Sequence, residues 1–349
     1  MVFTASPEPR SNDQNIVPVI DISRYFGGSE ADKHRIAREI DAACQAIGFL
    51  VVSGHGVLDD LINRMHIVSR RFFDLPVEAK RRHIRSDPNT HHGYYPLETN
   101  AVAYSRDDRT APPDYREIFS INPPRVDPTD PYYTSPLGRR IFAPNIWPDN
   151  IPGFADTWTE YYLAMERLAT SLMRLFALAL GLDEHWFDAK IDKHMTNLAA
   201  SNYPDQPAAL ANGQLRAGPH TDYGSLTILK TEDKPGGLEV LGADRTWREV
   251  PAVPKTFIIN LGDLMARWTN DRWVSTMHRV VNPPPGIDSR RQSLIFFHQP
   301  NYDAVIECLP GCHAADGPKY APITSGEHLL TKLQKTHGVG TEWISARRA

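Results

Sequence analysis

The first half of the chain combines helix-like apolar patterns with short apolar runs. Over residues 30–47, apolar side chains recur every three or four positions and share one face of a predicted helix: Ile36, Ile40, Ala43 and Ile47. Gly48 follows and suits a helix end, because glycine tolerates a left-handed backbone. We predict further helices over residues 59–73, 154–180 and 326–337, and buried strands over 16–22 and 49–52.

Short β-type runs dominate from about residue 197 onward. Turn residues separate the runs LTILKT, LEVLG, TWREV, TFIINLG, RWVST, HRVVN and RQSLIFFHQ. Many short strands at close spacing predict an all-β sandwich or barrel. A helix-rich half before such a region indicates an α+β fold, in which a jelly-roll (double-stranded β-helix) core carries packed helices and a helical N-terminal region.

Residues 87–153 are rich in Pro, Asp, Asn and Tyr and show little periodicity. We interpret them as long loops that face a substrate, since loops of this length in a compact domain are usually functional or disordered. The domain organisation we expect is a disordered tail, an N-terminal helical and strand region, a loop with a long support helix, the jelly-roll core and a C-terminal segment with a helix: residues 1–15, 16–125, 126–196, 197–305 and 306–349.

Composition and charge narrow the possible partners. The net charge is −4 and no long basic run is present, which argues against a nucleic-acid or anionic-membrane partner. No apolar stretch approaches the roughly 20 residues that span a bilayer, and the polar N-terminus has no signal-peptide core. Three cysteines are too few for a disulfide framework. These features predict a cytoplasmic protein that is a monomer or a homodimer.

A possible metal site lies in the strand-rich half. His220 and Asp222 are two positions apart, so on an extended strand both side chains point to one face. His278 lies far along the chain, but a jelly roll can bring its strand alongside. Two histidines and one carboxylate on one face match the facial triad of iron(II) oxygenases. A His-x-Asp pair alone is weak evidence, because the chain has 14 histidines.

A second pattern suggests an anion site. Arg291 and Ser293 share one strand face with the apolar Ile295 and Phe297. A guanidinium beside a hydroxyl suits a carboxylate, and an arginine inside an apolar barrel is costly without an anionic partner. The alternative is a surface arginine beside Arg290. A zinc site at Cys308, Cys312 and His313 lacks a fourth ligand, so a turn is the better interpretation there.

Several ordered motifs resemble the isopenicillin N synthase-like family of 2-oxoglutarate- and iron(II)-dependent dioxygenases. They are GPHTDYGSLTILKTEDKPGGLEV, NLGDLMARWTNDRWVSTMHRVVNPP and RRQSLIFFHQPNYDA, with VPVIDIS, GFLVVSGHGV and FFDLPVEAK near the N-terminus. The resemblance implies that His220, Asp222 and His278 bind iron. It also implies that Arg291, Ser293 and Tyr203 hold 2-oxoglutarate. Many relatives have Asn at the position of Ser201.

The resemblance implies a dioxygenase that takes iron(II), 2-oxoglutarate and O2, oxidises a C–H bond of a small molecule and releases succinate and CO2. The outcome is hydroxylation, desaturation or cyclisation. The alternatives are an iron oxidase of isopenicillin N synthase type that needs no 2-oxoglutarate, a non-catalytic binding protein and a zinc hydrolase. We expect pocket walls or substrate contacts from Tyr94, Tyr95, Arg116, Glu117, Tyr223, Met265 and Phe297. Packing of the loop itself explains Tyr94 and Tyr95 equally well.

Overall fold

Strands from all parts of the chain form the framework. The computed structural model describes residues 16–85, 87, 90, 92–99, 101–106, 110–206, 210–234, 237–284 and 286–337. Its strands are β1 (Val19–Asp21), β2 (Phe49–Ser53), β3 (Gly93–Tyr95), β4 (Glu117–Ile121), β5 (Asn197–Tyr203), β6 (Ala217–His220), β7 (Leu226–Thr231), β8 (Leu238–Leu241), β9 (Trp247–Glu249), β10 (Phe257–Leu261), β11 (His278–Val280), β12 (Arg291–His298), β13 (Val305–Ile306) and β14 (Ile323–Thr324).

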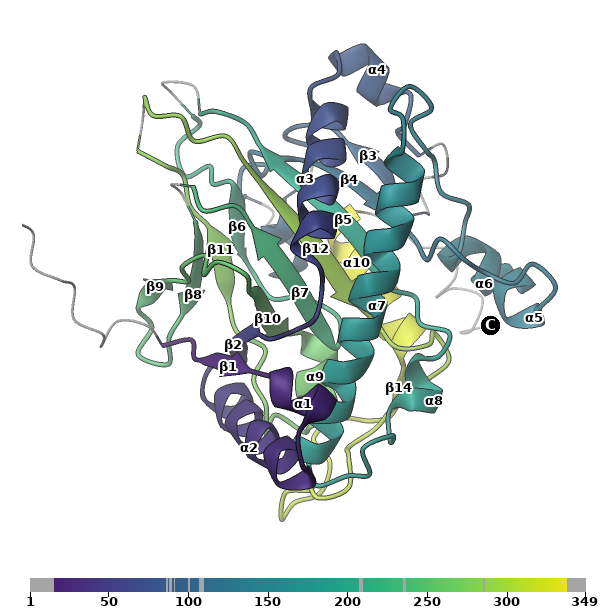
Figure 1. Ribbon diagram of the computed structural model, residues 1–349, viewed down its shortest axis with the longest axis vertical. Helices are drawn as coiled ribbons and strands as arrows, with labels where there is room; N and C mark the ends of the chain where they lie inside the picture. The colour runs from purple at the N-terminus through teal and green to yellow at the C-terminus, as the bar shows by residue number, and fades with distance from the viewer. Residues whose placement is uncertain are drawn as a thin grey trace, which may run out of the picture.

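Helices lie mainly on one side of this framework (Figure 1). They are α1 (Ser23–Gly27), α2 (Glu30–Ala46), α3 (Asp59–Phe73), α4 (Val77–Arg81), the 3-10 helix η2 (Val102–Arg106), α5 (Pro131–Thr134), α6 (Pro136–Ile141), α7 (Phe154–Ala179), α8 (Asp188–Ile191), α9 (Asp263–Trp268) and α10 (Ser325–His337). The predicted helices correspond to α2, α3, α7 and α10.

Two sheets form the jelly-roll core, and this confirms the predicted α+β fold. The larger has the strand order β1-β2-β10-β7-β12-β5-β4-β3, and the smaller has the order β6-β11-β8-β9. Only the β1–β2 pair of the larger sheet is parallel within the described chain. Strands from the N-terminal region therefore sit at both edges of the larger sheet and continue it.

The region of residues 87–153 differs from the predicted loops. It contains β3 and β4, which pair with each other, and β4 also pairs with β5. The run EIFSI of β4 is short and follows a Pro-rich stretch, so the sequence pattern alone did not predict a strand there.

The predicted strand RWVST is wrong, because residues 272–276 lie in irregular structure. The preceding run DLMARW forms α9, which is too short for a helical periodicity to show.

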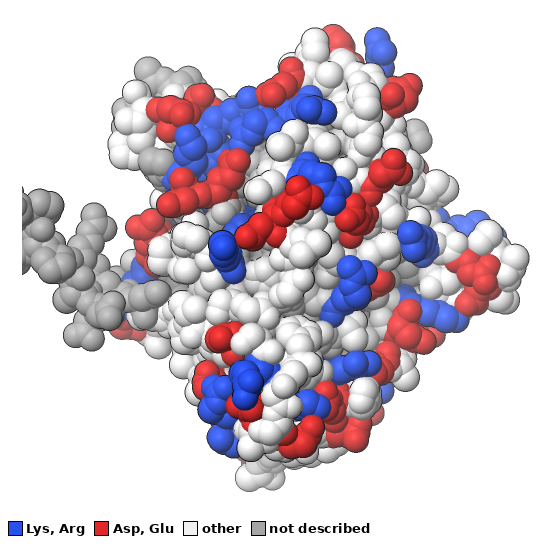
Figure 2. Space-filling model, in the orientation of Figure 1, with Lys and Arg blue, Asp and Glu red and all other residues white. Residues whose placement is uncertain are grey.

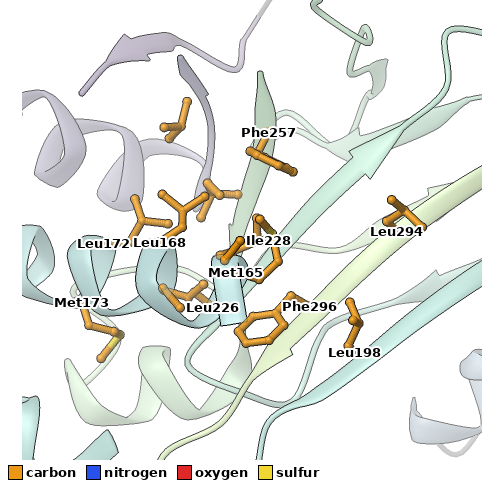
Figure 3. Close-up of a cluster of buried hydrophobic side chains, with 14 of the residues drawn as sticks. Met165, Leu168, Leu172, Met173, Leu198, Leu226, Ile228, Phe257, Leu294 and Phe296 are labelled. Carbon is orange, nitrogen blue, oxygen red and sulfur yellow. The ribbon is translucent and has the colours of Figure 1, made fainter. Parts of the chain in front are cut away.

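The face of the larger sheet that meets α3 and α7 is apolar. Phe296 of β12 and its cross-strand partner Ile228 of β7 lie near Met165 of α7, and Leu294 lies farther along β12 (Figure 3). Met165, Leu168 and Leu172 on α7 fill the other side of this core (Figure 3). Because side chains alternate along a strand, the intervening β12 residues face the opposite side, where the cavity lies.

Local signals explain how α2 begins and ends. The side chain of Ser29 accepts a hydrogen bond from the Asp32 backbone, and Asp32 accepts one from the Ser29 backbone, which is a capping box. At the other end Gly48 has φ of +65°. A Cβ atom there would lie 2.0 Å from the Val274 carbonyl oxygen, so only glycine fits this turn.

The visible surface carries mixed charge. Figure 2 shows basic and acidic side chains interspersed over most of the face that α2, α3 and α7 cover, with one group of basic side chains at the upper left that acidic side chains border. Ion pairs such as Arg64–Glu160 and Arg70–Glu232 contribute to this pattern. Among the described residues, no helix has the length and hydropathy needed to cross a membrane. Cys44, Cys308 and Cys312 are free thiols.

Candidate active site

Two paired strand ends bring the histidines of the predicted triad together. His220 is the last residue of β6, His278 is the first of β11, and the two are direct partners in the antiparallel ladder. Asp222 lies two residues beyond the end of β6 rather than within a strand, so it reaches the site from the loop toward β7. Ligand atoms of the three residues all lie within 4.8 Å of one another. In the described part of the chain, this is the only such group of His, Cys, Asp or Glu residues.

Hydrogen bonds orient each of these side chains toward a common point. Nδ1 of His220 donates to the Gly218 carbonyl at 2.8 Å, and Nδ1 of His278 donates to the Thr276 carbonyl at 3.0 Å. Both Nε2 atoms therefore keep a free lone pair. They lie 3.8 and 3.7 Å from Oδ1 of Asp222.

The other oxygen of Asp222 is fully engaged. Oδ2 accepts from the Thr227 hydroxyl at 2.5 Å and from the Asn260 amide at 2.7 Å, which leaves Oδ1 to face the imidazoles. Sequence reasoning missed both supporting residues. The alternation of LTILKT places Thr227 on the inward face and could have indicated it. Asn260 lies on β10, and no local pattern in the sequence marks it.

The electrostatic environment of His220 and Asp222 favours the protonation states that bind a cation. Burial, and then the neighbouring His278, lower the pKa of His220 to about 3, so its imidazole is neutral at pH 7. Burial raises the pKa of Asp222, but the two histidines and the hydrogen bonds from Asn260 and Thr227 outweigh it and hold that pKa below its ordinary value. Two imidazoles and a carboxylate form a donor set that fits iron(II).

The second predicted pattern lies farther along the same cavity. Arg291 and Ser293 are at the start of β12, and both are 2% exposed. The Arg291 guanidinium donates to the Thr231 hydroxyl, and the Ser293 hydroxyl donates to the same oxygen at 3.3 Å. The Arg291 guanidinium also lies over the Tyr203 ring, 5.5 Å from its centroid. A buried guanidinium with hydroxyls beside it fits a carboxylate group.

Ser201 lies next to this cluster. It is fully buried, it is the ladder partner of Ser293, and its hydroxyl has no hydrogen-bond partner among the described residues. Asn202 cannot replace the usual Asn, because its side chain points to the opposite sheet face and donates to Glu117 at 2.9 Å.

One cavity joins the two patterns. Both sheets, the segment from Tyr95 to Asn122, and α10 contribute to its wall. His220, Asp222, His278, Tyr203, Arg291 and Ser293 all line it, together with four of the residues predicted as pocket walls or substrate contacts: Tyr95, Arg116, Tyr223 and Phe297. Sequence reasoning missed Asn122, Asn197 and Gln299, and missed the α10 residues Leu329, Leu330 and Leu333, because the lining positions of separate elements become apparent only in the folded chain.

Three residues predicted to contact substrate lie elsewhere. Tyr94 and Glu117 each adjoin a cavity residue on a strand, so alternation turns them to the opposite face. There the Tyr94 hydroxyl donates to Glu117 at 2.5 Å, and the Lys80 ammonium binds the same carboxylate at 2.7 Å. Met265 of α9 is completely buried in the main hydrophobic core.

Comparison with known proteins identifies the family. A family model described as the 2OG-Fe(II) oxygenase superfamily matches residues 194–300, and a model described as the non-haem dioxygenase in morphine synthesis N-terminal matches residues 17–150. The 2-oxoglutarate-Fe(II) type oxidoreductase hxnY of Emericella nidulans is 33% identical, and the match covers 92% of this chain and 90% of the relative. The chain belongs to the 2-oxoglutarate- and iron(II)-dependent dioxygenase family. It is therefore a non-haem oxygenase whose cofactors are iron(II) and 2-oxoglutarate.

Other relatives are named for different molecules or have been solved in complex with them. Validamycin A dioxygenase of Streptomyces hygroscopicus subsp. limoneus is 31% identical, with 90% of this chain and 85% of that protein covered. The crystal structure of a full-length Neurospora crassa protein in complex with alpha-KG and thymine is similar with a TM-score of 0.79 and 30% identity, over 93% of this chain and 98% of that one. The family is thus established, while its members differ in substrate.

Proposed function

We propose that this dioxygenase oxidises a C–H bond of a small molecule and converts 2-oxoglutarate to succinate and CO2. The observation that carries the proposal is the convergence of three ligand atoms beside a buried arginine and serine in one cavity. Bound iron(II) would couple the decarboxylation of 2-oxoglutarate by dioxygen to oxidation of the substrate. In a hydroxylation, one oxygen atom enters the product and the other enters succinate.

The residues divide into two groups by role. His220, Asp222 and His278 would hold the iron, and their fixed tautomers and hydrogen bonds mean that no side chain must reorient when it binds. Arg291 and Ser293 would hold the distal carboxylate of 2-oxoglutarate, and Tyr203 would form the wall beside it. This division fits the chemistry of the side chains at each end of the cavity.

The apolar wall supports a small-molecule substrate. Ile118, Val280 and Phe297 line the cavity, and leucines of α10 cover it. Exclusion of water from such a site protects a reactive centre from side reactions. Hydroxylation, desaturation and cyclisation are all compatible with these walls.

Measurement of succinate tests the proposal. We expect iron-loaded protein with substrate and 2-oxoglutarate to form one succinate for each substrate oxidised. Substrate oxidation without succinate would instead support an oxidase of the isopenicillin N synthase type, because an arginine and serine pair can also hold a substrate carboxylate.

A pair of neighbouring variants tests the role of Arg291. We expect Arg291→Met to raise KM for 2-oxoglutarate by roughly 100-fold, because charge-assisted hydrogen bonds to a carboxylate contribute about 3 kcal/mol. Arg290→Met is the matched control, since Arg290 pairs with Asp74 at 2.6 Å and does not line the cavity. An equal rise in both variants would contradict the assignment.

A further inference from the structure

A buried ion pair stands in the cavity wall close to the metal ligands. Nη2 of Arg116 donates to Oδ2 of Asp114 at 3.1 Å. Asp114 is 2% exposed as a residue, and the Arg116 side chain is 10% exposed. Arg116 lines the cavity together with His220, whereas Asp114 lies behind it. Arg116 therefore contributes to the cavity wall with a side chain that is nearly buried.

Asp114 fixes the position of the arginine. Its Oδ1 accepts from the Gly218 backbone at 2.9 Å, and its Oδ2 accepts from the Val102 backbone at 3.2 Å. Gly218 is on β6, and its carbonyl is the group that orients His220. The carboxylate thus anchors Arg116 to the same strand that carries a metal ligand, and a rigid support of this kind suits a residue that positions a substrate.

Arg116 has more donors than partners. A guanidinium carries five N–H groups. The Arg116 side chain interacts with Asp114 and with the Tyr203 side chain, and its Nε has no hydrogen-bond partner in the described part of the chain. Burial of donors without acceptors is unfavourable. The observation points to an acceptor that a ligand brings into the cavity.

The charged residues that line the cavity restrict the charge of that ligand. Of the described residues that line the cavity, Asp222 is the only Asp or Glu, and it belongs to the metal site. A cationic substrate would therefore find no carboxylate to pair with. Arg116 already has Asp114 as its counterion, so the pair needs no further negative charge.

We infer that Arg116 positions the substrate by donating a hydrogen bond to a carbonyl oxygen of an uncharged, largely apolar molecule such as an amide, lactam or ketone. This inference rests on the proposed function, since it names the substrate class of the same site. Ile118 of β4, two residues after Arg116, lines the same cavity and provides an apolar surface for the rest of such a molecule.

A sorted compound library tests the class of ligand. Three sets matched in size contain uncharged amides and ketones, amines that are protonated at neutral pH, and carboxylates. Each compound is scored by succinate formed above the level without substrate. We expect active compounds in the carbonyl set. Activity confined to amines or carboxylates, or a background formation of succinate that no carbonyl compound raises, overturns the inference. Absence of succinate with every compound and without any compound would instead contradict the proposed function.

A variant of Arg116 then tests whether this residue binds the carbonyl compound. For the most active carbonyl compound, binding to iron- and 2-oxoglutarate-loaded protein is measured by calorimetry without oxygen. Loss of one charge-assisted hydrogen bond predicts a Kd about 10- to 100-fold higher in Arg116→Met. The Kd of 2-oxoglutarate should rise by a clearly smaller factor, because Arg116 interacts with Tyr203 beside that site and the loss reaches 2-oxoglutarate through this neighbour. An equal loss for both ligands, or no loss for the carbonyl compound, overturns the assignment.

The controls separate binding from folding. Arg248→Met removes an exposed Arg–Asp pair outside the cavity lining and should leave both Kd values unchanged. If Arg116→Met does not fold, because it leaves Asp114 buried without its counterion, the double variant Asp114→Asn/Arg116→Met removes both charges together and gives the same comparison.

Discussion

Adjacent residues on β3 and at the start of β4 have opposite environments, and this decides which of them face the cavity. Tyr95 and Arg116 line the cavity, while Tyr94 and Glu117 belong to a buried polar cluster with Lys80. The sequence allowed the triad and Arg291 to be predicted, because their spacing and chemistry are distinctive. It could not separate Arg116 from Glu117, because β4 itself was not apparent from the pattern and the inward face was therefore unknown.

Glu117 should be important for stability rather than for substrate binding. Glu117→Ala leaves Lys80, which is 6% exposed, as an unpaired buried charge. Removal of one partner of a buried pair costs about 3–5 kcal/mol in free energy of unfolding. Denaturant unfolding measures this loss. Asp244→Ala breaks the exposed pair with Arg248 and should cost less than about 1 kcal/mol. Equal effects in the two variants would contradict the structural role of Glu117.

The pairing and packing of whole strands and helices determine where the site residues lie. The antiparallel pairing of β6 and β11 places the two histidines together, and α10 covers the cavity with leucine side chains. The long helices α2, α3 and α7 could be predicted because their periodicity extends over many residues. The short α9 and β4 could not, since tertiary contacts rather than local pattern determine such short elements.

Acid should weaken the attachment of α10. His328 on α10 is 8% exposed and bonds the Tyr223 carbonyl at 3.1 Å. Burial, and then the positive charge of Lys332, lower its pKa from 6.5 to about 4, with Arg267 adding to the effect and Asp263 opposing it. The unfolded chain therefore takes up a proton below about pH 6.5, whereas the folded chain does so only near pH 4. Stability should thus fall as the pH falls through this window, by up to about 3 kcal/mol.

A glutamine variant isolates this effect. Gln can keep a hydrogen bond to the carbonyl but does not titrate, so His328→Gln should lose less stability than the wild type between about pH 7 and pH 4. Unfolding by denaturant at a series of pH values measures the difference. His34→Gln, at an exposed position on α2, should follow the wild-type profile. Parallel profiles for the wild type and His328→Gln would contradict the linkage.

At the scale of the molecule, the two family-model matches share one sheet. Strands β1 to β4 lie at both edges of the larger sheet, around strands that come from residues 197–298. Helices α2, α3 and α7 cover the same sheet, and one core cluster includes residues of all three helices. The substrate could not be predicted at this scale, because the cavity wall combines side chains from many separate elements.

The shared sheet predicts one cooperative unfolding unit. Calorimetry should give a single transition, with agreement between the calorimetric and van't Hoff enthalpies. A chain that begins at residue 194 should not fold, because loss of α7 and β2 would expose Phe257, Ile259 and Phe296, all at most 1% exposed in the full protein. Two separate transitions, or a folded fragment, would contradict this account.

The central claim is that His220, Asp222 and His278 hold one iron(II), and titration of iron into metal-free protein tests it most directly. We expect one iron per wild-type chain. The Asp222→Ala variant removes one of the three protein ligands, so it should bind iron at least roughly 100-fold more weakly. The melting temperature of the metal-free variant should show that it is folded. Wild-type iron affinity in a folded Asp222→Ala variant would contradict the assignment.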